Sequence, residues 1–229
     1  MADTTIIQKA TECTMNASNL IYIFGTLLLA IISLWGPLFR KWLIAPKLQI
    51  RFTEEPPLCH LTSRVNGTDV YYFRFAVKNV GKSQAKLCEA VLEELWVENA
   101  AGKLVKEPNF SPVSLIWSVI RQQFMHINPE REQFCDLGHL SDSAFQNHPQ
   151  SQEFLNSLPQ DRNVMKFFFD QQHLLFSQKA YLVPGKYRVK VSVYSENARK
   201  ISIYFRVAWS GVWKSNEKDQ FKELVIENA

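Results

Sequence analysis

The segment Gly185–Trp209 reads GKYRVKVSVYSENARKISIYFRVAW, and it contains two runs in which apolar and polar residues alternate. Side chains of a β-strand point alternately to its two faces, so each run predicts a strand with one buried face. The short polar connection Ser195–Ala198 joins the runs, which predicts a β-hairpin. The apolar face of this hairpin should face the core. Its side chains are Tyr187, Val189, Val191, Val193, Ile201, Ile203, Phe205 and Val207.

The same two-residue period recurs on the N-terminal side of the hairpin. Lys47–Phe52 and Val70–Lys78 alternate clearly. Ala85–Glu98 combines the Leu and Glu content of a helix with the β-branched and aromatic residues of a strand. We assign it to a strand because a strand pattern lies on each side of it. Shorter candidate strands lie at 113–119, 133–137 and 224–226.

These segments together predict the fold class. About seven to nine short strands with turn-forming residues between them, and no interleaved helices, are typical of an all-β, immunoglobulin-like antiparallel β-sandwich. The sandwich should occupy residues 47–229, which is enough chain for one domain with a sizeable core. A polar stretch near 138–163 predicts a long loop, with room for a short helix at 152–158.

An uncharged run from Leu20 to Phe39 precedes this domain. As a helix, about twenty residues span about 30 Å, the thickness of the hydrocarbon core of a bilayer. A cleaved signal peptide usually has a shorter apolar core and a small-residue cleavage site, and a buried core helix is rarely free of charge over this length. We therefore predict a single transmembrane helix at 19–41, after a short tail at 1–18 and before a juxtamembrane linker at 42–46.

Positive charge near the helix ends predicts its orientation. Lys9 is the only cationic side chain before the helix, whereas four follow it closely: Arg40, Lys41, Lys47 and Arg51. Because Lys and Arg are retained on the cytoplasmic side, we expect a single-pass protein of the cell (inner or plasma) membrane, with its N-terminus outside and its C-terminal domain in the cytoplasm. Trp35 and Trp42 should lie at the membrane interface together with Arg40 and Lys41.

The cysteines agree with this orientation. Three of the four lie beyond the helix, namely Cys59, Cys88 and Cys135, and none belongs to a CxxC pair. Exported domains of this size more often pair their thiols, whereas a cytosolic domain keeps them reduced. An odd number of cysteines is therefore more typical of a cytoplasmic sandwich.

Two motifs give the predicted sandwich a resemblance to a known family. Val77–Gly81 reads VKNVG, is followed by Ser83 and Ala85, and resembles the V-x-N-x-G segment of bacterial and archaeal immunoglobulin-like domains of the adhesion-related, CARDB type. Pro184–Tyr187, before a Val-rich strand, is similar to the penultimate strand of such domains. The resemblance implies an immunoglobulin-like fold and a non-catalytic binding or spacer role. Most of those domains are exported, unlike the orientation that the cations predict.

We find no sequence pattern of a catalytic or metal centre. The nucleophile elbow, the P-loop, the dinucleotide fingerprint and HExxH are absent. Ser-x-x-Lys matches at 83–86 and 215–218 lack their companion motifs, and Cys135-x-x-x-His139 is the only closely spaced pair of potential zinc ligands. We expect no enzyme activity, no cofactor and no metal site.

One face of the predicted hairpin carries cations and aromatic rings: Arg188, Lys190, Tyr194, Tyr204 and Arg206, with Trp213 just beyond. Such a face can contact another protein, lipid head groups or nucleic acid. A net charge of +4 is low for a nucleic-acid binder. The structural alternative is ion pairing with the acidic segment Glu89–Glu94 on a neighbouring strand. For Trp213 the alternative is to cap the end of the sandwich.

The sequence thus predicts a membrane-anchored β-sandwich that acts as a non-catalytic binding module at the cytoplasmic membrane face. Its expected partners are the lipid bilayer and another protein. The first alternative is the reversed topology, with the sandwich outside the cytoplasm as an envelope or adhesion module. An uncharacterised hydrolase is the third possibility.

Overall fold

The computed structural model describes residues 19–36, 44–63, 69–141, 165–171 and 181–229. The chain forms two compact units, Met1–Ala45 and Pro46–Ala229. In the first unit, Asn19–Gly36 forms a helix that is long and apolar enough to cross a membrane. Its side chains are not buried inside the chain, unlike those of a core helix. The rest of the predicted span, with Arg40 and Lys41, lies outside the described residues, and so does Trp42 of the predicted linker.

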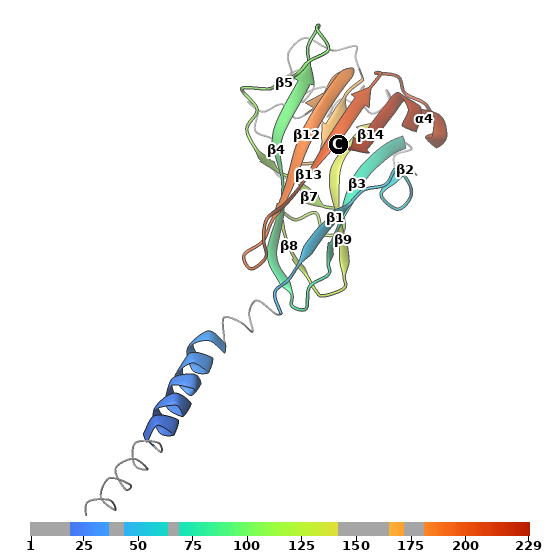
Figure 1. Ribbon diagram of the computed structural model, residues 1–229. Helices are drawn as coiled ribbons and strands as arrows, with labels where there is room; N and C mark the ends of the chain where they lie inside the picture. Colours follow the sequence, from blue (N-terminus) through green and yellow to red (C-terminus); the bar gives the residue numbers. More distant parts are fainter. Residues whose placement is uncertain (1–18, 37–43, 64–68, 142–164, 172–180) are drawn as a thin grey trace, which may run out of the picture. The chain divides into compact units, whose positions relative to one another are not determined.

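The second unit consists of two antiparallel sheets (Figure 1). Sheet A has the order β1 (Leu48–Arg51), β3 (Asp69–Asn79), β9 (Glu132–Ser141), β10 (Phe167–Phe169) and β11 (Tyr181–Leu182), with β2 (Cys59–Ser63) paired to β3 and β7 (Ile116–Trp117) paired to β9. Sheet B has the order β14 (Leu224–Asn228), β13 (Ile201–Trp209), β12 (Gly185–Tyr194), β4 (Ala85–Glu98) and β5 (Leu104–Lys106), with β6 (Val113–Ser114) and β8 (Phe124–Ile127) paired to β4.

The predicted all-β antiparallel sandwich behind one apolar helix is confirmed. β12 and β13 form the predicted hairpin, and Ala85–Glu98 is a strand rather than a helix. The described residues contain fourteen strands instead of the expected seven to nine, because several strands are pieces of two to four residues. The segment 113–119 is divided between β6 in sheet B and β7 in sheet A. β9 continues to Ser141 and so includes the first residues of the predicted loop, whereas 142–163 lies outside the described residues.

The inner faces of the two sheets form one apolar core, and the hairpin contributes the residues that its alternation predicted. Six of the eight are buried and two, Ile201 and Ile203, are half-buried. Phe205 of β13 lies with its ring centroid 5.2 Å from that of Phe52 and 6.1 Å from that of Phe75 on β3, so aromatic contacts connect the sheets.

The VKNVG motif has a structural role at the end of β3. Asn79 is fully buried, and its side-chain amide donates to the carbonyls of Ser83 and Ile127 at 2.7 and 2.9 Å. Its Oδ1 accepts from the backbone N–H groups of Lys47 and Gly81 at 3.2 and 3.0 Å. One side chain therefore satisfies four backbone groups where the first strand, the β3–β4 turn and β8 meet.

Candidate functional site

The outer face of sheet B brings together five of the six residues predicted as a contact face. β12 supplies Arg188, Lys190 and Tyr194, and β13 supplies Tyr204 and Arg206. The register places Arg188 opposite Arg206 and Lys190 opposite Tyr204, so these side chains are direct cross-strand neighbours. β4, on the other side of β12, adds Trp96 opposite Arg188 and Glu94 opposite Lys190.

Cations and aromatic rings alternate across this face. The Arg188 guanidinium lies 4.3 Å from the centroid of the Trp96 ring and 5.5 Å from that of the Tyr204 ring. The Lys190 ammonium is 5.9 Å from the Tyr204 ring, and that of Lys200 is 4.8 Å from the Tyr194 ring. Each such contact stabilises by about 0.5–1 kcal/mol at a partly exposed site, so the rings hold the cations in fixed positions.

A bulge in β4 places two carboxylates on this face. The β12–β4 register shifts between Lys190, which pairs with Glu94, and Val191, which pairs with Leu92, so Glu93 is the extra residue. Strict alternation would send Glu93 and Glu94 to opposite faces. The bulge lets both reach Lys190, at 3.0 and 3.4 Å.

Glu93 is the centre of this ion-pair network. Its carboxylate also lies 2.6 Å from the Lys200 ammonium, and it accepts hydrogen bonds from Ser192 at 2.8 Å and from the Tyr194 hydroxyl. Burial acts to raise the pKa of Glu93, but the hydrogen bonds from Lys200, Tyr194, Ser192 and Lys190 outweigh it and lower the pKa to about 2. Glu93 therefore stays ionised and offsets part of the positive charge of Lys190 and Lys200.

The cations of this face therefore form ion pairs with the acidic segment of β4. This is the structural alternative to a contact role that the sequence offered. The contact role of the face stays a prediction. Tyr194 and Tyr204 remain exposed on this face, and so does Lys200. Arg206 is exposed too and has no ion pair among the described residues. The surface thus combines exposed tyrosines with cations whose charge Glu93 and Glu94 balance only in part.

Trp213 lies apart from this face. Its ring centroid is 5.1 Å from that of Tyr71, a buried residue of β3, and the side chain packs half-buried against the core. This is the capping position that was the alternative to an interface role. Trp35, near the end of the helix Asn19–Gly36, is exposed like the other large side chains of that helix, and its place at a membrane interface stays a prediction.

A polar cluster on the outer face of sheet A was not visible in the sequence. Arg74 of β3 donates to buried Asp136 of β9 at 2.8 Å, and the Ser118 hydroxyl donates to the same oxygen at 2.6 Å. His139 and Asp170 form a second pair, with Nδ1 and Oδ1 3.1 Å apart. These residues meet only through the β3–β9–β10 pairing, which no local pattern encodes.

The Cys–His spacing noted in the sequence does not produce a metal site. Cys135 is fully buried with its Sγ 3.4 Å from the carbonyl oxygen of Ile116, whereas His139 lies beside Asp170. Across the described part of the chain, no three His, Cys, Asp or Glu side chains are arranged to hold a metal ion. Burial raises the pKa of the Cys135 thiol well above its ordinary value, which removes its reactivity at neutral pH.

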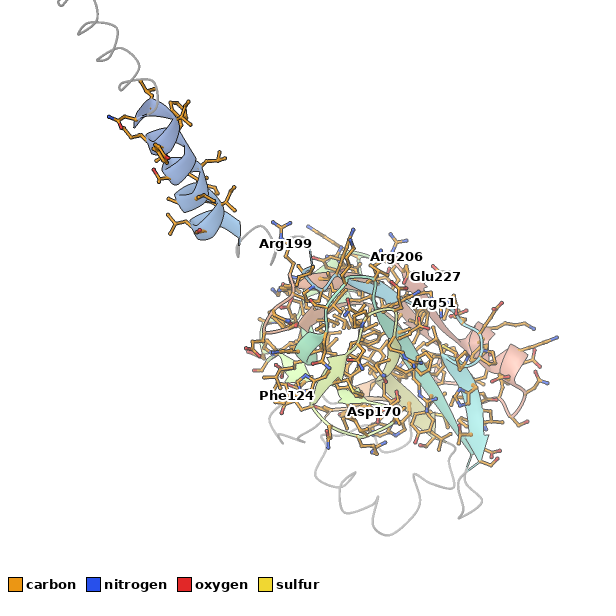
Figure 2. All side chains as sticks on the ribbon, turned by 90° about the horizontal axis from the view of Figure 1, so that it is seen from below. Arg51, Phe124, Asp170, Arg199, Arg206 and Glu227 are labelled. Carbon is orange, nitrogen blue, oxygen red and sulfur yellow. The ribbon has the colours of Figure 1, made fainter. Side chains whose placement is uncertain are left out.

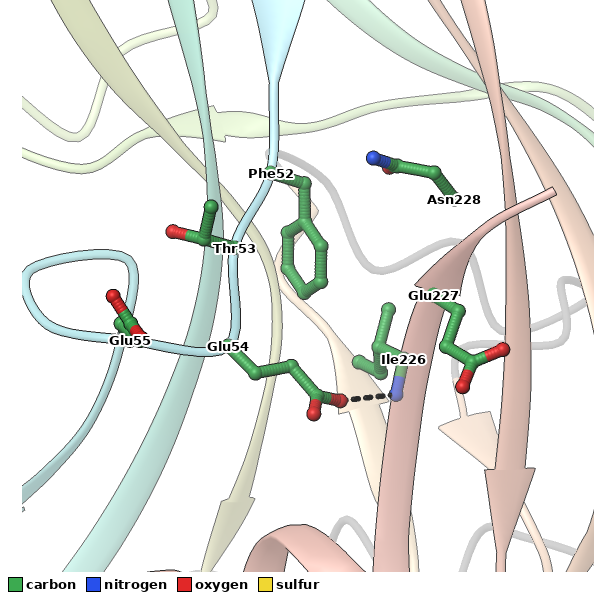
Figure 3. Close-up of a pocket in the computed structure, with 7 residues that line it drawn as sticks. All are labelled: Phe52, Thr53, Glu54, Glu55, Ile226, Glu227 and Asn228. Carbon is green, nitrogen blue, oxygen red and sulfur yellow. Dashed lines mark hydrogen bonds between the residues drawn. The ribbon is translucent and has the colours of Figure 1, made fainter.

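Two hollows lie on one side of the sandwich, between the edge strands of the two sheets. One, of about 500 Å³, is lined by residues 52–55 and by Ile226, Glu227 and Asn228 (Figure 3). The other, of about 300 Å³, lies between β1 and β13 and is lined by Leu48, Gln49, Ile50, Ile201, Ser202 and Ile203. Sequence reasoning missed both because they depend on which strands are edges.

The same side carries several charged side chains. Figure 2 shows Arg51, Arg199, Arg206 and Glu227 on the side of the sandwich opposite to Phe124 and Asp170. Three of these four are cations, and all four side chains are exposed.

Comparison with known proteins adds no assignment. No protein-family model matches the chain, and a search of curated proteins finds no matching relative.

Proposed function

We propose that the chain is a single-pass, membrane-anchored β-sandwich that acts as a non-catalytic binding module for another protein at the cytoplasmic membrane face. The observation that carries this proposal is the outer face of sheet B. Exposed Tyr194, Tyr204 and Arg206 lie there on a scaffold fixed by the Glu93 network. Tyrosine and arginine are among the side chains enriched at protein contact surfaces.

The ion pairing of the lysines on this face favours a protein over a lipid surface. Lys190 and Lys200 are paired with Glu93, and Lys106 and Lys190 are paired with Glu94 at 3.2 and 3.4 Å. A polybasic segment attracts anionic lipid through unpaired cations, each contributing about 1 kcal/mol. Paired cations give up most of that attraction, whereas tyrosine rings keep their capacity to pack against a protein.

Photo-crosslinking in intact membranes tests the proposal. A photoreactive amino acid in place of Tyr204 should give a discrete higher-mass adduct after irradiation, because this side chain is exposed on the contact face. The matched control replaces Lys103, which is exposed in the turn before β5. An adduct specific to Tyr204 that Arg206→Ala weakens supports the proposal. Equal labelling at both positions, or none at either, would argue against a contact face here.

A further inference from the structure

Strand β13 is paired unequally on its two sides. Along β12 it is paired over its whole length, from Ile201 to Trp209. Along β14 it is paired only from Phe205 to Trp209, and the carbonyl of Tyr204 accepts a last hydrogen bond from the N–H of Ala229 at 2.8 Å. Before Tyr204, this side of β13 has no strand partner among the described residues.

The pairing of Tyr204 shows to which side of β13 the backbone N–H and C=O of Ser202 point. In a strand, the N–H and C=O of one residue point to one side and those of the next residue point to the other. Because the Tyr204 carbonyl points toward β14, the N–H and C=O of Ser202 point to that side as well. The Ser202 hydroxyl is 2.7 Å from the Ser192 hydroxyl of β12, so the side chain does not turn to satisfy its own backbone.

An apolar groove runs beside this open edge. It is the hollow of about 300 Å³ between β1 and β13, to which Leu48, Ile50, Ile201 and Ile203 contribute apolar side chains. Three of these four are only half-buried. If another strand paired with β13 here, its side chains would point alternately into the groove and to the outer face. Every second side chain of that strand would therefore cover the apolar residues of the groove.

Cations flank both ends of the groove. Lys47 and Arg199 lie just before its two walls, and Arg51 and Arg206 lie just after them. All four side chains are exposed. Arg51 is paired with Glu132 at 3.1 Å, and Arg206 lies opposite Glu227 in the β13–β14 register. Lys47 and Arg199 have no ion pair among the described residues. Because β14 already pairs with β13 from Phe205 onward, the open stretch runs from Arg199 to Tyr204, and these five steps span about 16 Å of extended chain.

We propose that this edge is a peptide-binding site, at which an extended segment of a partner protein with alternating apolar residues and acidic ends adds as a strand to Ile201–Tyr204. The inference deepens the proposed function by naming the site and the chemistry of the partner. The Ser202 backbone supplies hydrogen bonds, the groove takes the apolar side chains, and the flanking cations select acidic ends.

Fluorescence anisotropy with the full chain in nanodiscs tests this site. The probe is a labelled six-residue peptide, matched to 199–204, with aspartate at both ends and valine alternating with threonine between them. Saturable binding is expected, and Ser202→Pro should weaken it at least tenfold by removing the outward N–H. Ser202→Ala, the matched control, loses only the hydroxyl and should stay within about twofold.

Two probe variants keep the test independent of protein folding. Methylation of the peptide nitrogens that face β13 should abolish binding, and lysine ends in place of aspartate should weaken it at least tenfold. Charge reversal at Lys47 and Arg199 should weaken binding of the aspartate peptide, whereas Lys103→Glu should not. No saturation by about 1 mM peptide, or equal binding of the methylated peptide, overturns the proposal.

The remaining outcomes identify other occupants or separate the two proposals. If light scattering shows dimers of the full chain that Ser202→Pro dissociates, the edge pairs with a second copy and the peptide proposal is wrong. If the Tyr204 crosslink forms but no peptide binds, the result supports the binding-module proposal and contradicts the peptide-binding site. Peptide binding with no crosslink supports the edge site and contradicts a contact role for the outer face of sheet B.

Discussion

The side chain of Glu54 closes the outer edge of β14, because its carboxylate accepts a hydrogen bond from the backbone N–H of Ile226 at 2.7 Å (Figure 3). An edge strand with unpaired N–H groups is a template for unwanted pairing. Here Glu54, a residue of the β1–β2 connection, accepts the hydrogen bond that a neighbouring strand would otherwise accept from Ile226. Burial raises the pKa of Glu54, the bond from Ile226 opposes the rise, and nearby Glu227 adds to it, so the net shift is upward.

Replacing Glu54 should separate its hydrogen bond from its charge. Glu54→Gln keeps an acceptor oxygen and removes the ionisation, so we expect a change of less than about 1 kcal/mol at pH 7. Glu54→Ala leaves the Ile226 N–H without its partner and should cost about 1–2 kcal/mol. Urea unfolding of the full chain in detergent measures both.

The sign of the pH effect follows from the raised pKa. The folded state holds the Glu54 proton more tightly than the unfolded state, so the contribution of this residue to stability falls as pH rises from the ordinary value of 4.5 through the folded value. Glu54→Gln should flatten that slope. An unchanged slope would mean that Glu54 does not titrate differently on folding.

Glu93 should show the opposite pH dependence. Its folded pKa of about 2 lies below the ordinary value of 4.5, so its stabilisation is complete above the unfolded pKa and is lost as pH falls toward 2. Glu93→Gln leaves Lys190 and Lys200 without their shared counter-ion and should cost about 1–3 kcal/mol at pH 7, with little cost at pH 2. The exposed pair Lys78–Glu130 is the control, since Glu130→Gln should cost less than about 0.5 kcal/mol.

Asn79→Ala should be among the most destabilising single changes in the sandwich. It leaves four backbone partners of the amide unsatisfied, and each buried polar group left unpaired costs about 1–3 kcal/mol. We expect a loss of at least about 3 kcal/mol in urea unfolding. Asn128→Ala removes one exposed bond, to Gln84, and serves as the control. Equal effects of the two variants would contradict a central role for Asn79.

Gly138→Ala should disrupt the β9–β10 pairing. A Cβ at this position would lie 2.3 Å from the carbonyl oxygen of Phe168 and 2.6 Å from the ring of Phe167. The nearest atom belongs to the backbone of Phe168, which cannot move aside as the end of a flexible side chain can. The added methyl group should therefore lower the free energy of unfolding by about 3 kcal/mol. Gly25→Ala in the apolar helix meets nothing within 4 Å and should leave the thermal midpoint unchanged. A melting curve of each variant compares them.

The orientation of the domain can be read with an impermeant thiol reagent. Cys59, Cys88 and Cys135 are fully buried, so their protection in intact cells carries no information about sidedness. Lys218→Cys places a thiol on the exposed surface of α4 (Glu217–Glu223), and Cys13 precedes the helix. A cytoplasmic sandwich predicts labelling at Cys13 and protection at 218 until the cells are permeabilised. Labelling at 218 in sealed cells would establish the reversed topology.

The sequence allowed prediction of the strands whose burial follows a strict period. Tyr187, Val189 and Val191 alternate with polar residues and are buried as expected. Helix α4 was missed although Asn216 at its N-cap, which accepts from Asp219 N at 3.3 Å, is a recognised start signal. The bulge at Glu93 and the open edge at Ser202 could not be predicted, because both depend on the register between strands far apart in the chain.

Lys47 is where tension on the preceding chain would enter the sandwich. Its N–H is held by the Asn79 side chain, and its carbonyl accepts from the N–H of Val80 at 2.8 Å. Both contacts lie at the end of β3, the eleven-residue strand with neighbours on both sides. Mechanical load would therefore pass into an interior strand before it could peel the four-residue edge strand β1 from the sheet. A pull on the chain before Lys47 must therefore break the hydrogen bond to the Asn79 side chain before strand β1 can separate from the sheet.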